Sequence, residues 1–375
     1  MKVLNILYRI MPSGAEKMLA DAADTFKAAG VEGCVLANDD EDGAFAPVLR
    51  KKGYRIFRIP WRKSRLHLVE FWRLCRRERF DVVHIHVIRG YSSFAIAAKL
   101  AGVKTVVKTM HGLFKARDPM RRIVHSAKRA IARLVGTKMV AIGRTVQENE
   151  RRTFFNPCRL IFNFADETGF PLASGKIGAE VRKELGVGQD KFVLLTVGNC
   201  HSQKHQEIKN HQLLIRALAA LPTEKRNKVV YLHVGKEMEG FPERSLAEDL
   251  GVLENIRFLG SREDVWRMLS AANLFVMPST CEGLGVSAIE AALSGREMLL
   301  AKAYGLLDFK YVLDSGVGYF ELSPESLADA IMKTMESLPI GACDGNAHMR
   351  EQALATFSMK SGVTSLMKLY KGGEE

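Results

Sequence analysis

A helix is predicted within the stretch Glu282-Gly283-Leu284-Gly285-Val286-Ser287-Ala288-Ile289-Glu290-Ala291-Ala292-Leu293-Ser294-Gly295. Two carboxylates, Glu282 and Glu290, stand eight residues apart at the start of this otherwise apolar helix. In an α-helix, residue i+8 returns to within roughly 80° of residue i at about 12 Å along the axis, so both carboxylates are expected to face one side. Glu290 has apolar neighbours, among which an unpaired carboxylate would be costly to bury. This spacing suits a sugar at one end and a ribose at the other, with a diphosphate between them.

The glycines of the stretch favour phosphate binding. Gly283 and Gly285 leave the backbone bare where the helix is expected to begin. Free N–H groups at that end, together with the positive end of the helix dipole, form a site for phosphate oxygens. The segment therefore predicts binding of a whole nucleotide sugar.

Length and composition indicate a protein with two globular lobes. The chain has 375 residues, of which 47% are hydrophobic, enough for two real cores. It contains no run of 18 apolar residues, and its opening residues lack the pattern of a signal peptide, so a cytoplasmic location is expected. Six cysteines are scattered singly without CxxC spacing, which disfavours a disulfide framework or a structural zinc site.

The net charge of +13 is concentrated in the first half of the chain. Residues 1–175 hold 32 lysines and arginines against 16 acidic residues, whereas the remaining 200 residues hold 23 against 26. Two basic stretches with helical periodicity, 61–77 and 120–134, account for much of this excess. Such helices either pack on a sheet with solvated basic faces or lie on an anionic membrane surface, and their occurrence together favours the membrane. The residues expected to face the membrane or the acceptor are Trp61, Arg62, Lys63, Trp72, Arg121, Arg122, Lys128 and Arg129.

Apolar runs alternate with helical periods along most of the chain, which predicts an α/β protein with two doubly wound parallel sheets. The predicted elements include a helix from Ala15 to Ala29 and strands at Phe192–Val197 and Leu274–Met277. We expect an N-terminal Rossmann-like domain at 1–165 facing the acceptor and membrane, a linker at 166–190 and a second Rossmann-like domain at 191–350. The last residues, 351–375, are expected to form a helix crossing back, followed by a tail. Ligands of such sheets bind beyond the carboxyl ends of the strands, so two facing domains are expected to bind across their cleft.

The motifs named above and several shorter ones resemble the retaining glycosyltransferases of family 4, the group 1 transferases, which have the GT-B fold. The similar positions extend over nearly the whole chain. In this family the final helix returns to the N-terminal domain. The residues that carry the resemblance are Gly14-Ala15-Glu16, Asp81 to His86, His111-Gly112, Ala141-Ile142-Gly143, Asn163, Val197-Gly198, Lys209-Asn210-His211, Phe258-Leu259-Gly260, Asp264-Val265, Met277-Pro278-Ser279, and Glu282 with Glu290.

The resemblance implies a role for each residue of the donor site. Glu282 would bind hydroxyls of the donor sugar, and Glu290 would bind the ribose. His111 would lie near the reacting carbon, and Lys209 would neutralise the leaving phosphates, where charge builds as the glycosidic bond breaks. No metal or cofactor would then be required. The backbone of Gly283, Leu284 and Gly285 would contact the diphosphate, and the turn at Ser13 and Gly14 would approach it.

Four features of the sequence depart from the family pattern, and the first three concern the donor site. The usual two-glycine turn is Ser13-Gly14 here, and the usual Gly-Arg is Gly198-Asn199, which removes one expected phosphate cation. The loop that follows Asn199 is longer than usual. Either its His201, Lys204 or His205 would supply the missing charge, or the donor site would be weakened. After the two-carboxylate stretch, Arg296-Glu297-Met298 replaces a proline-containing strand entry.

The resulting prediction is a metal-independent, retaining transferase. It would move a sugar from a nucleotide donor, with UDP the commonest choice, to a lipid-linked saccharide in polysaccharide or glycolipid synthesis, such as that of a capsule or exopolysaccharide. It would associate peripherally with the inner face of the cell membrane, and no nucleic-acid partner is expected.

Two alternatives remain open from sequence, a nonhydrolysing sugar-nucleotide 2-epimerase and a basic nucleic-acid-binding protein. A dinucleotide-dependent oxidoreductase is disfavoured because no GxGxxG follows the first strand. His84 and His86 have the spacing to share one face of a strand, but no third metal ligand is evident.

Overall fold

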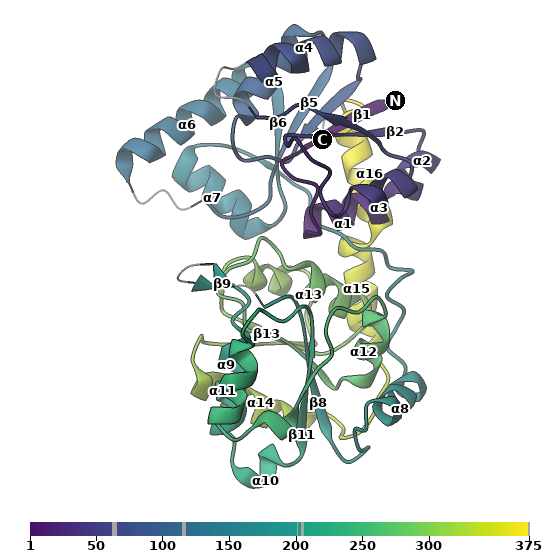
Figure 1. Cartoon of the computed structure of the whole chain (residues 1–375), viewed down its shortest axis with the longest axis vertical. Coiled ribbons are helices and arrows are strands. Elements are labelled where there is room, and N and C mark those ends of the chain that lie inside the picture. The colour runs from purple at the N-terminus through teal and green to yellow at the C-terminus, as the bar shows by residue number, and fades with distance from the viewer. Residues whose placement is uncertain (62–65, 115–117, 201, 204–205, 374–375) are drawn as a thin grey trace. The chain divides into compact units, whose positions relative to one another are not determined.

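The chain folds into two compact units, described here from a computed structural model that covers residues 1–61, 66–114, 118–200, 202–203 and 206–373 (Figure 1). Unit 1 comprises Met1–Ala165 and Met359–Glu375, and unit 2 comprises Asp166–Ser358. Within the described part, no helix is long and apolar enough to cross a membrane.

Unit 1 contains a seven-stranded parallel sheet in the order β3-β2-β1-β4-β5-β6-β7. The chain goes first to one side of β1 and then to the other, so a switch in strand order lies between β1 and β4. The strands are β1 (Lys2–Leu7), β2 (Glu32–Ala37), β3 (Arg55–Arg58), β4 (Val82–Ile85), β5 (Thr105–Met110), β6 (Thr137–Ala141) and β7 (Arg159–Leu160).

Helices cover both faces of this sheet because successive strand residues alternate in direction. Leu4 and Ile6 point into one core with α4 (Leu66–Glu78) and α5 (Tyr91–Leu100). Val3 points into the other core, which is shared with α16 (Met359–Tyr370), so the predicted return of the last helix to the N-terminal domain is confirmed. The remaining helices of unit 1 are α1 (Gly14–Asp21), α2 (Ala23–Ala28), α3 (Ala46–Lys51), α6 (Pro119–Leu134) and α7 (Arg144–Phe154).

Unit 2 contains a six-stranded parallel sheet in the order β12-β11-β8-β13-β14-β15 and a short antiparallel pair, β9 (Ser202–Gln203) with β10 (Gln206–Glu207). In the larger sheet the chain adds strands first on one side of β8 and then on the other, so the switch in strand order lies between β8 and β13. Its strands are β8 (Phe192–Val197), β11 (Val229–Val234), β12 (Ile256–Phe258), β13 (Leu274–Met277), β14 (Met298–Ala301) and β15 (Val317–Phe320). Its helices are α8 (Gly175–Glu184), α9 (His211–Ala220), α10 (Thr223–Arg226), α11 (Pro242–Asp249), η1 (Leu253–Asn255), α12 (Val265–Ala271), α13 (Val286–Leu293), η2 (Leu306–Tyr311), α14 (Pro324–Ser337) and α15 (Ala347–Phe357).

The structure differs from the sequence-based expectation in three places. The helix expected from Ala15 to Ala29 is divided at Ala22 into α1 and α2. The segment expected as a linker, 166–190, contains α8, which packs against α12 inside unit 2. The helix expected to begin near Glu282 begins only at Val286.

A close contact in unit 1 fixes α16 against the rest of that unit. A Cβ atom added to Gly362 would lie 1.9 Å from Cδ1 and 2.4 Å from Cγ of the Phe164 ring. Phe164 is itself buried in the core that α16 shares, so its ring has little room to move. Glycine at position 362 therefore allows the helix to approach Phe164.

We expect Gly362→Ala to destabilise unit 1 by about 1–3 kcal/mol through overpacking. Alanine favours a helix over glycine by about 1 kcal/mol, so the opposite sign would follow if helix propensity dominated. The free energy of unfolding, measured by chemical denaturation, distinguishes the two effects. Lys360→Ala, at an exposed position of the same helix, is the matched control and should leave stability nearly unchanged.

Candidate functional site

Two oppositely charged side chains meet at the carboxyl edge of the larger sheet of unit 2. Lys209 belongs to the loop after β8, and Glu282 to the loop after β13. These two strands are parallel neighbours on either side of the switch in strand order, the place where ligands of such sheets bind. The structure thus brings together two of the three residues predicted to be catalytic.

Lys209 and Glu282 form an ion pair in which Nζ lies 2.8 Å from Oε1. The side chains are 27% and 14% exposed, so the pair is partly shielded from water but accessible to a ligand. Gly198 lies beside the stem of Lys209, because a Cβ added there would be 3.4 Å from Cδ and Cε of the lysine. A cation and a carboxylate at one sheet edge can bind a phosphate and a sugar hydroxyl side by side.

Backbone contacts hold the loop around Glu282. The N–H of Glu282 donates to the carbonyl of Tyr304, and the N–H of Thr280 donates to the carbonyl of Ile208. Gly305 has φ +82°, and a Cβ there would lie 2.4 Å from the carbonyl oxygen of Glu282. The loops after β8, β13 and β14 therefore fix the position of this carboxylate together.

The expectation that Glu282 and Glu290 share one helix is wrong. Gly285 has φ +77° and caps α13, so the helix starts at Val286 and Glu282 lies in the preceding loop. The separation estimated for two carboxylates on one helix therefore does not apply. Glu290 does lie on α13, where it is buried, and Leu284 is also buried.

Of the other predicted donor-site residues, Asn199 lies in the loop after β8. Asn199 accepts a hydrogen bond through Oδ1 from the N–H of Lys236, at 2.8 Å. Its carboxamide therefore ties this loop to the one after β11. The proposed sources of the missing charge, His201, Lys204 and His205, lie outside the described residues.

In unit 1, His111 follows β5 at the carboxyl edge of the sheet and contacts a second histidine. His86 Nδ1 lies 2.8 Å from His111 Nε2, and His86 Nε2 lies 3.3 Å from Oδ1 of Asn5. Asn5 donates through Nδ2 to the carbonyl of Cys34, which orients Oδ1 toward His86. These contacts join residues of β1, β4 and β5 across the switch in strand order.

The hydrogen-bond partners determine where the protons of these imidazoles lie. Burial lowers the pKa of His111 to about 3, with a further effect of the Lys108 charge, and burial also lowers the pKa of His86 well below its usual value. Both rings are therefore neutral near pH 7. Because the Asn5 oxygen only accepts, His86 carries its proton on Nε2 and accepts through Nδ1 from His111 Nε2–H. His111 then keeps a lone pair on Nδ1.

A cavity of about 200 Å³ in unit 1 includes His111, Lys108, Tyr91 and Phe114 in its lining. Burial lowers the pKa of Lys108 to about 7, and its ammonium group donates to the carbonyls of His86 and Thr109. Sequence analysis did not single out Lys108, since a lysine inside the strand Thr105–Met110 gives no signal of its burial.

The predicted turn residues Ser13 and Gly14 are exposed at the start of α1. The Ser13 hydroxyl donates to the carboxylate of Glu16. No hydrogen bond from the Ser13 side chain to the helix backbone caps α1, so the hydroxyl is held by Glu16 instead.

Helix α6 presents apolar as well as basic residues to solvent. Met120, Ile123 and Leu134 are 64%, 62% and 86% exposed. Arg129, predicted to face a membrane, is instead buried at 4% exposure. The reason is its bidentate pair with buried Glu150 of α7, at 2.6 and 2.7 Å.

The other residues predicted for this face have varied positions. Trp61 and Trp72 are exposed, as are Arg121, Arg122 and Lys128 on α6. Arg122 donates through Nε to the carbonyl of Thr153 at 2.8 Å, so part of its guanidinium is engaged within unit 1. Arg62 and Lys63 lie outside the described residues.

Sequence analysis also missed a cluster of three possible metal ligands, Cys200, His211 and His233, in unit 2. Their separations of 11 and 22 residues along the chain correspond to no short metal-binding motif. Only the strand order, which places β11 beside β8, would have brought them together.

Family models match each unit separately. Residues 13–159 match the glycosyl transferase 4-like domain, and residues 179–353 match the glycosyl transferases of group 1. The first match lies within unit 1 and the second within unit 2.

Two similar proteins illustrate the sequence comparison. A UDP-Gal:alpha-D-GlcNAc-diphosphoundecaprenol alpha-1,3-galactosyltransferase of Escherichia coli is 27% identical over 253 residues, which are 65% of this chain and 63% of that protein. The match thus spans less than two thirds of that relative. The putative glycosyltransferase EpsF of Bacillus subtilis is 24% identical over 98% of this chain and 96% of its own length.

Two solved structures show the fold. HepE of Anabaena, in complex with UDP, has a TM-score of 0.79 and 20% identity, with 99% of this chain and 100% of that chain covered. WaaG, a glycosyltransferase involved in lipopolysaccharide biosynthesis, has a TM-score of 0.68 and 18% identity over 99% and 100% of the two chains. The GT-B fold expected from sequence is therefore confirmed.

We expect histidine side-chain ¹⁵N chemical shifts at pH 7 to show His86 and His111 both neutral and both protonated on Nε2. The physical reason is the Asn5 oxygen, which accepts and cannot donate. In Asn5→Leu, the preference of His86 for the Nε2–H form should weaken, and that of His111 should weaken with it. Asn38→Leu, a change of another buried asparagine in unit 1, is the control. A protonated imidazolium signal from His111 at pH 7 would contradict the assignment.

Proposed function

Because the chain belongs to the group 1 glycosyltransferases of the GT-B fold, we propose that it transfers a sugar from a UDP-linked donor to a lipid-linked saccharide with retention of configuration. The observation that carries the donor assignment is the pair of Lys209 and Glu282 at the switch point of the unit 2 sheet. The two family matches favour a transferase over the epimerase and the nucleic-acid-binding protein.

The donor roles proposed for unit 2 follow from charge and position. Lys209 neutralises the diphosphate as it leaves, and Glu282 accepts hydrogen bonds from hydroxyls of the donor sugar. The backbone around Gly283 to Gly285 contacts the diphosphate, and Glu290 binds the ribose. HepE, which is similar in fold to this chain, has structures in complex with UDP and with UDP-glucose, and these support the choice of UDP.

Retention is proposed to proceed by attack of the acceptor on the same face from which the diphosphate leaves. Glu282 is engaged with Lys209, which suits a role in binding rather than in forming a covalent sugar intermediate. The leaving diphosphate then helps to remove the proton of the acceptor hydroxyl. Neutral His111, with a lone pair on Nδ1, is proposed to contact the donor sugar, and no metal takes part in the transfer.

The acceptor is proposed to bind in unit 1. The cavity beside His111 is large enough for part of a sugar, and aromatic side chains such as Tyr91 and Phe114 contribute to its lining. A lipid-linked saccharide is supported by the printed activity of the Escherichia coli relative, which acts on a diphosphoundecaprenol-linked sugar. With such an acceptor, the proposed biological role of the enzyme is in the synthesis of a polysaccharide such as a capsule or exopolysaccharide.

A membrane-held acceptor is supported by the exposed surface of α6. Its exposed apolar residues Met120, Ile123 and Leu134 are accompanied by the exposed cations Arg121 and Lys128. Apolar residues can enter the lipid interface while each nearby cation contributes about 1 kcal/mol on an anionic surface. We therefore propose a cytoplasmic protein that associates with the inner face of the cell membrane.

We expect Glu282→Ala to lower kcat/KM for transfer from UDP-sugar by about 100-fold or more, because the donor sugar loses a charged partner and Lys209 loses its counter-ion. The donor would first be identified by thermal-shift screening against a panel of nucleotide sugars. Glu254→Ala, at an exposed position of the same unit, is the control and should retain full activity.

Wild-type activity of the Glu282→Ala protein would refute the donor assignment, provided that its melting temperature is unchanged. The same assay reports stereochemistry, because proton NMR of the product gives the anomeric configuration. An inverted product, or a covalent glycosyl-enzyme trapped from a slow donor, would overturn the proposed mechanism.

We expect Ile123→Ser combined with Leu134→Ser to reduce co-sedimentation with anionic phospholipid vesicles by at least tenfold, because both substituted side chains are exposed and apolar. Ile340→Ser, at an exposed apolar position of unit 2, should bind vesicles as the wild type does. Equal sedimentation of all three proteins would exclude α6 as the membrane contact. A tRNA filter-binding assay tests the nucleic-acid alternative in parallel.

A further inference from the structure

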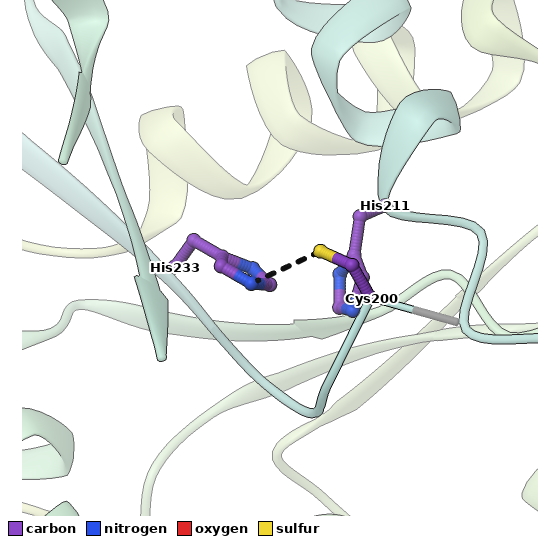
Figure 2. A group of neighbouring side chains, drawn as sticks. All are labelled: Cys200, His211 and His233. Carbon is purple, nitrogen blue, oxygen red and sulfur yellow. Dashed lines mark hydrogen bonds between the residues drawn. The ribbon is translucent and has the colours of Figure 1, made fainter. Parts of the chain in front are cut away.

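Three potential metal ligands converge in unit 2 from different elements. Cys200 lies in the loop after β8, His211 is the first residue of α9, and His233 belongs to β11. Figure 2 shows the Cys200 thiol directed at the His233 imidazole, with the His211 ring beside Cys200. Among the residues that the structure describes, this is the group whose ligand atoms come within 4.8 Å of one another.

The distances resemble those of a tetrahedral site. Cys200 Sγ lies 3.4 Å from His233 Nε2. With zinc at about 2.3 Å from sulfur and about 2.0 Å from nitrogen, two tetrahedral ligands of these types are separated by roughly 3.5 Å. The other separations between the ligand atoms of the three residues do not exceed 4.8 Å.

The surroundings of His233 prepare the correct nitrogen for coordination. Its Nδ1 lies 3.2 Å from the Thr196 hydroxyl and 3.1 Å from the Tyr231 hydroxyl. An Nδ1–H that donates to either hydroxyl leaves the Nε2 lone pair directed at Cys200. Ligating histidines usually have such a hydrogen-bond partner on the second nitrogen, which fixes the ring and the tautomer.

The three side chains are all buried, which suits a soft donor set shielded from water. Burial lowers the pKa of His233 to about 4 and that of His211 well below its usual range. Both rings are therefore neutral at pH 7, the form in which imidazole binds metals.

We propose that Cys200, His211 and His233 bind one Zn²⁺ ion. Binding replaces the proton shared by the thiol and Nε2 of His233: bonds form from zinc to sulfur and to nitrogen, the S–H bond breaks, and the proton leaves to solvent. The fourth position takes a water molecule, as in other sites with three protein ligands. The donor set excludes Mg²⁺ and Ca²⁺, which prefer oxygen ligands.

The ion has a structural role and takes no part in sugar transfer. It joins the loop after β8 to β11 and to the first turn of α9, and Lys209 lies only two residues before His211. The bound metal would thereby restrict the loop that presents Lys209. It adds to the existing hydrogen bond between Asn199 and the backbone of Lys236, which connects the same two loops.

The test uses the full chain, treated with a chelator and then titrated with Co²⁺ alone in anaerobic buffer. We expect one equivalent of Co²⁺ to produce two signals. One is a thiolate-to-metal charge-transfer band in the near ultraviolet, and the other is the set of visible absorption bands of tetrahedral cobalt. Zn²⁺ added afterwards should displace the cobalt and remove both signals. In a separate sample without cobalt, Zn²⁺ alone should raise the melting temperature of unit 2.

Cys200→Ser should abolish the near-ultraviolet band, and His233→Gln should weaken Co²⁺ binding at least tenfold. Cys343→Ser is the matched control, since this cysteine of the same unit accepts a hydrogen bond from Arg296 at 3.2 Å and is not part of the cluster. It should bind as the wild type does. Circular dichroism establishes that each variant is folded.

Absence of a charge-transfer band in the wild type would overturn the proposal, as would an equally strong band in the Cys200→Ser protein. Binding that is unchanged in both cluster variants, or lost equally in Cys343→Ser, would place the metal elsewhere and would also refute it. Because these readouts do not depend on sugar transfer, they are independent of the proposed enzymatic function.

Discussion

The ion pair of Lys209 and Glu282 is the interaction on which the donor site proposed for unit 2 depends. Its partners are 73 residues apart in the sequence, yet Nζ and Oε1 lie 2.8 Å apart because β8 and β13 are parallel neighbours. Without a ligand, each charge neutralises the other in a place where water is partly excluded, and an unpaired charge there would be costly. A diphosphate that bound Lys209, as proposed, would therefore compete with Glu282 for the lysine.

This competition gives the pair a chemical consequence. In the proposed function, phosphate oxygens that approach Lys209 would release Glu282 to accept hydrogen bonds from sugar hydroxyls, so that binding at one end of the donor would prepare the other end. The rigid loop around Glu282 supports such an exchange. Its backbone is held by the carbonyl of Tyr304 and by the close approach of Gly305, so the carboxylate stays in place while the flexible lysine moves. Preorganised groups of this kind stabilise developing charge without reorganising during the reaction.

The parts of the fold that could be predicted are those encoded by local patterns. Buried parallel strands are continuous apolar runs, so Phe192–Val197 and Leu274–Met277 were predicted with the bounds that the structure has. The start of α13 was not, because the periodicity of residues 282–295 does not reveal that Gly285 adopts a left-handed conformation and delays the helix. Glu282 was singled out by its spacing from Glu290, and Lys209 through family resemblance. Their ion pair depends on strand order, which spacing alone does not contain.

Period-two alternation explains why the histidines of unit 1 are associated with the last helix. His84 and His86 point to the same face of the sheet as Val82, and that face is covered by α16. His84 lies 2.7 Å from the hydroxyl of Tyr370 and 2.6 Å from that of Thr109, so the helix end satisfies a ring that could not otherwise be buried. Its neighbour His86 is then left to contact His111. The return of α16 thus does more than cover apolar strands, since it also completes the polar layer behind His111.

The same requirement to satisfy buried polar groups explains the unusual orientation of α6. Arg129 is drawn inward by Glu150, and its guanidinium lies 3.9 Å from the centre of the Phe154 ring. Breaking such a buried pair by removing one partner typically costs about 3–5 kcal/mol, so the orientation of the helix is strongly fixed. Once Arg129 faces inward, helical geometry turns Ile123 and Leu134 outward, whatever their hydrophobicity.

A prediction from periodicity assumes that the apolar face of a helix is the buried face, and in α6 an ion pair reverses this relation. The exposed apolar surface is therefore a consequence of the packing of unit 1, and a lipid interface is the environment in which it would be most stable.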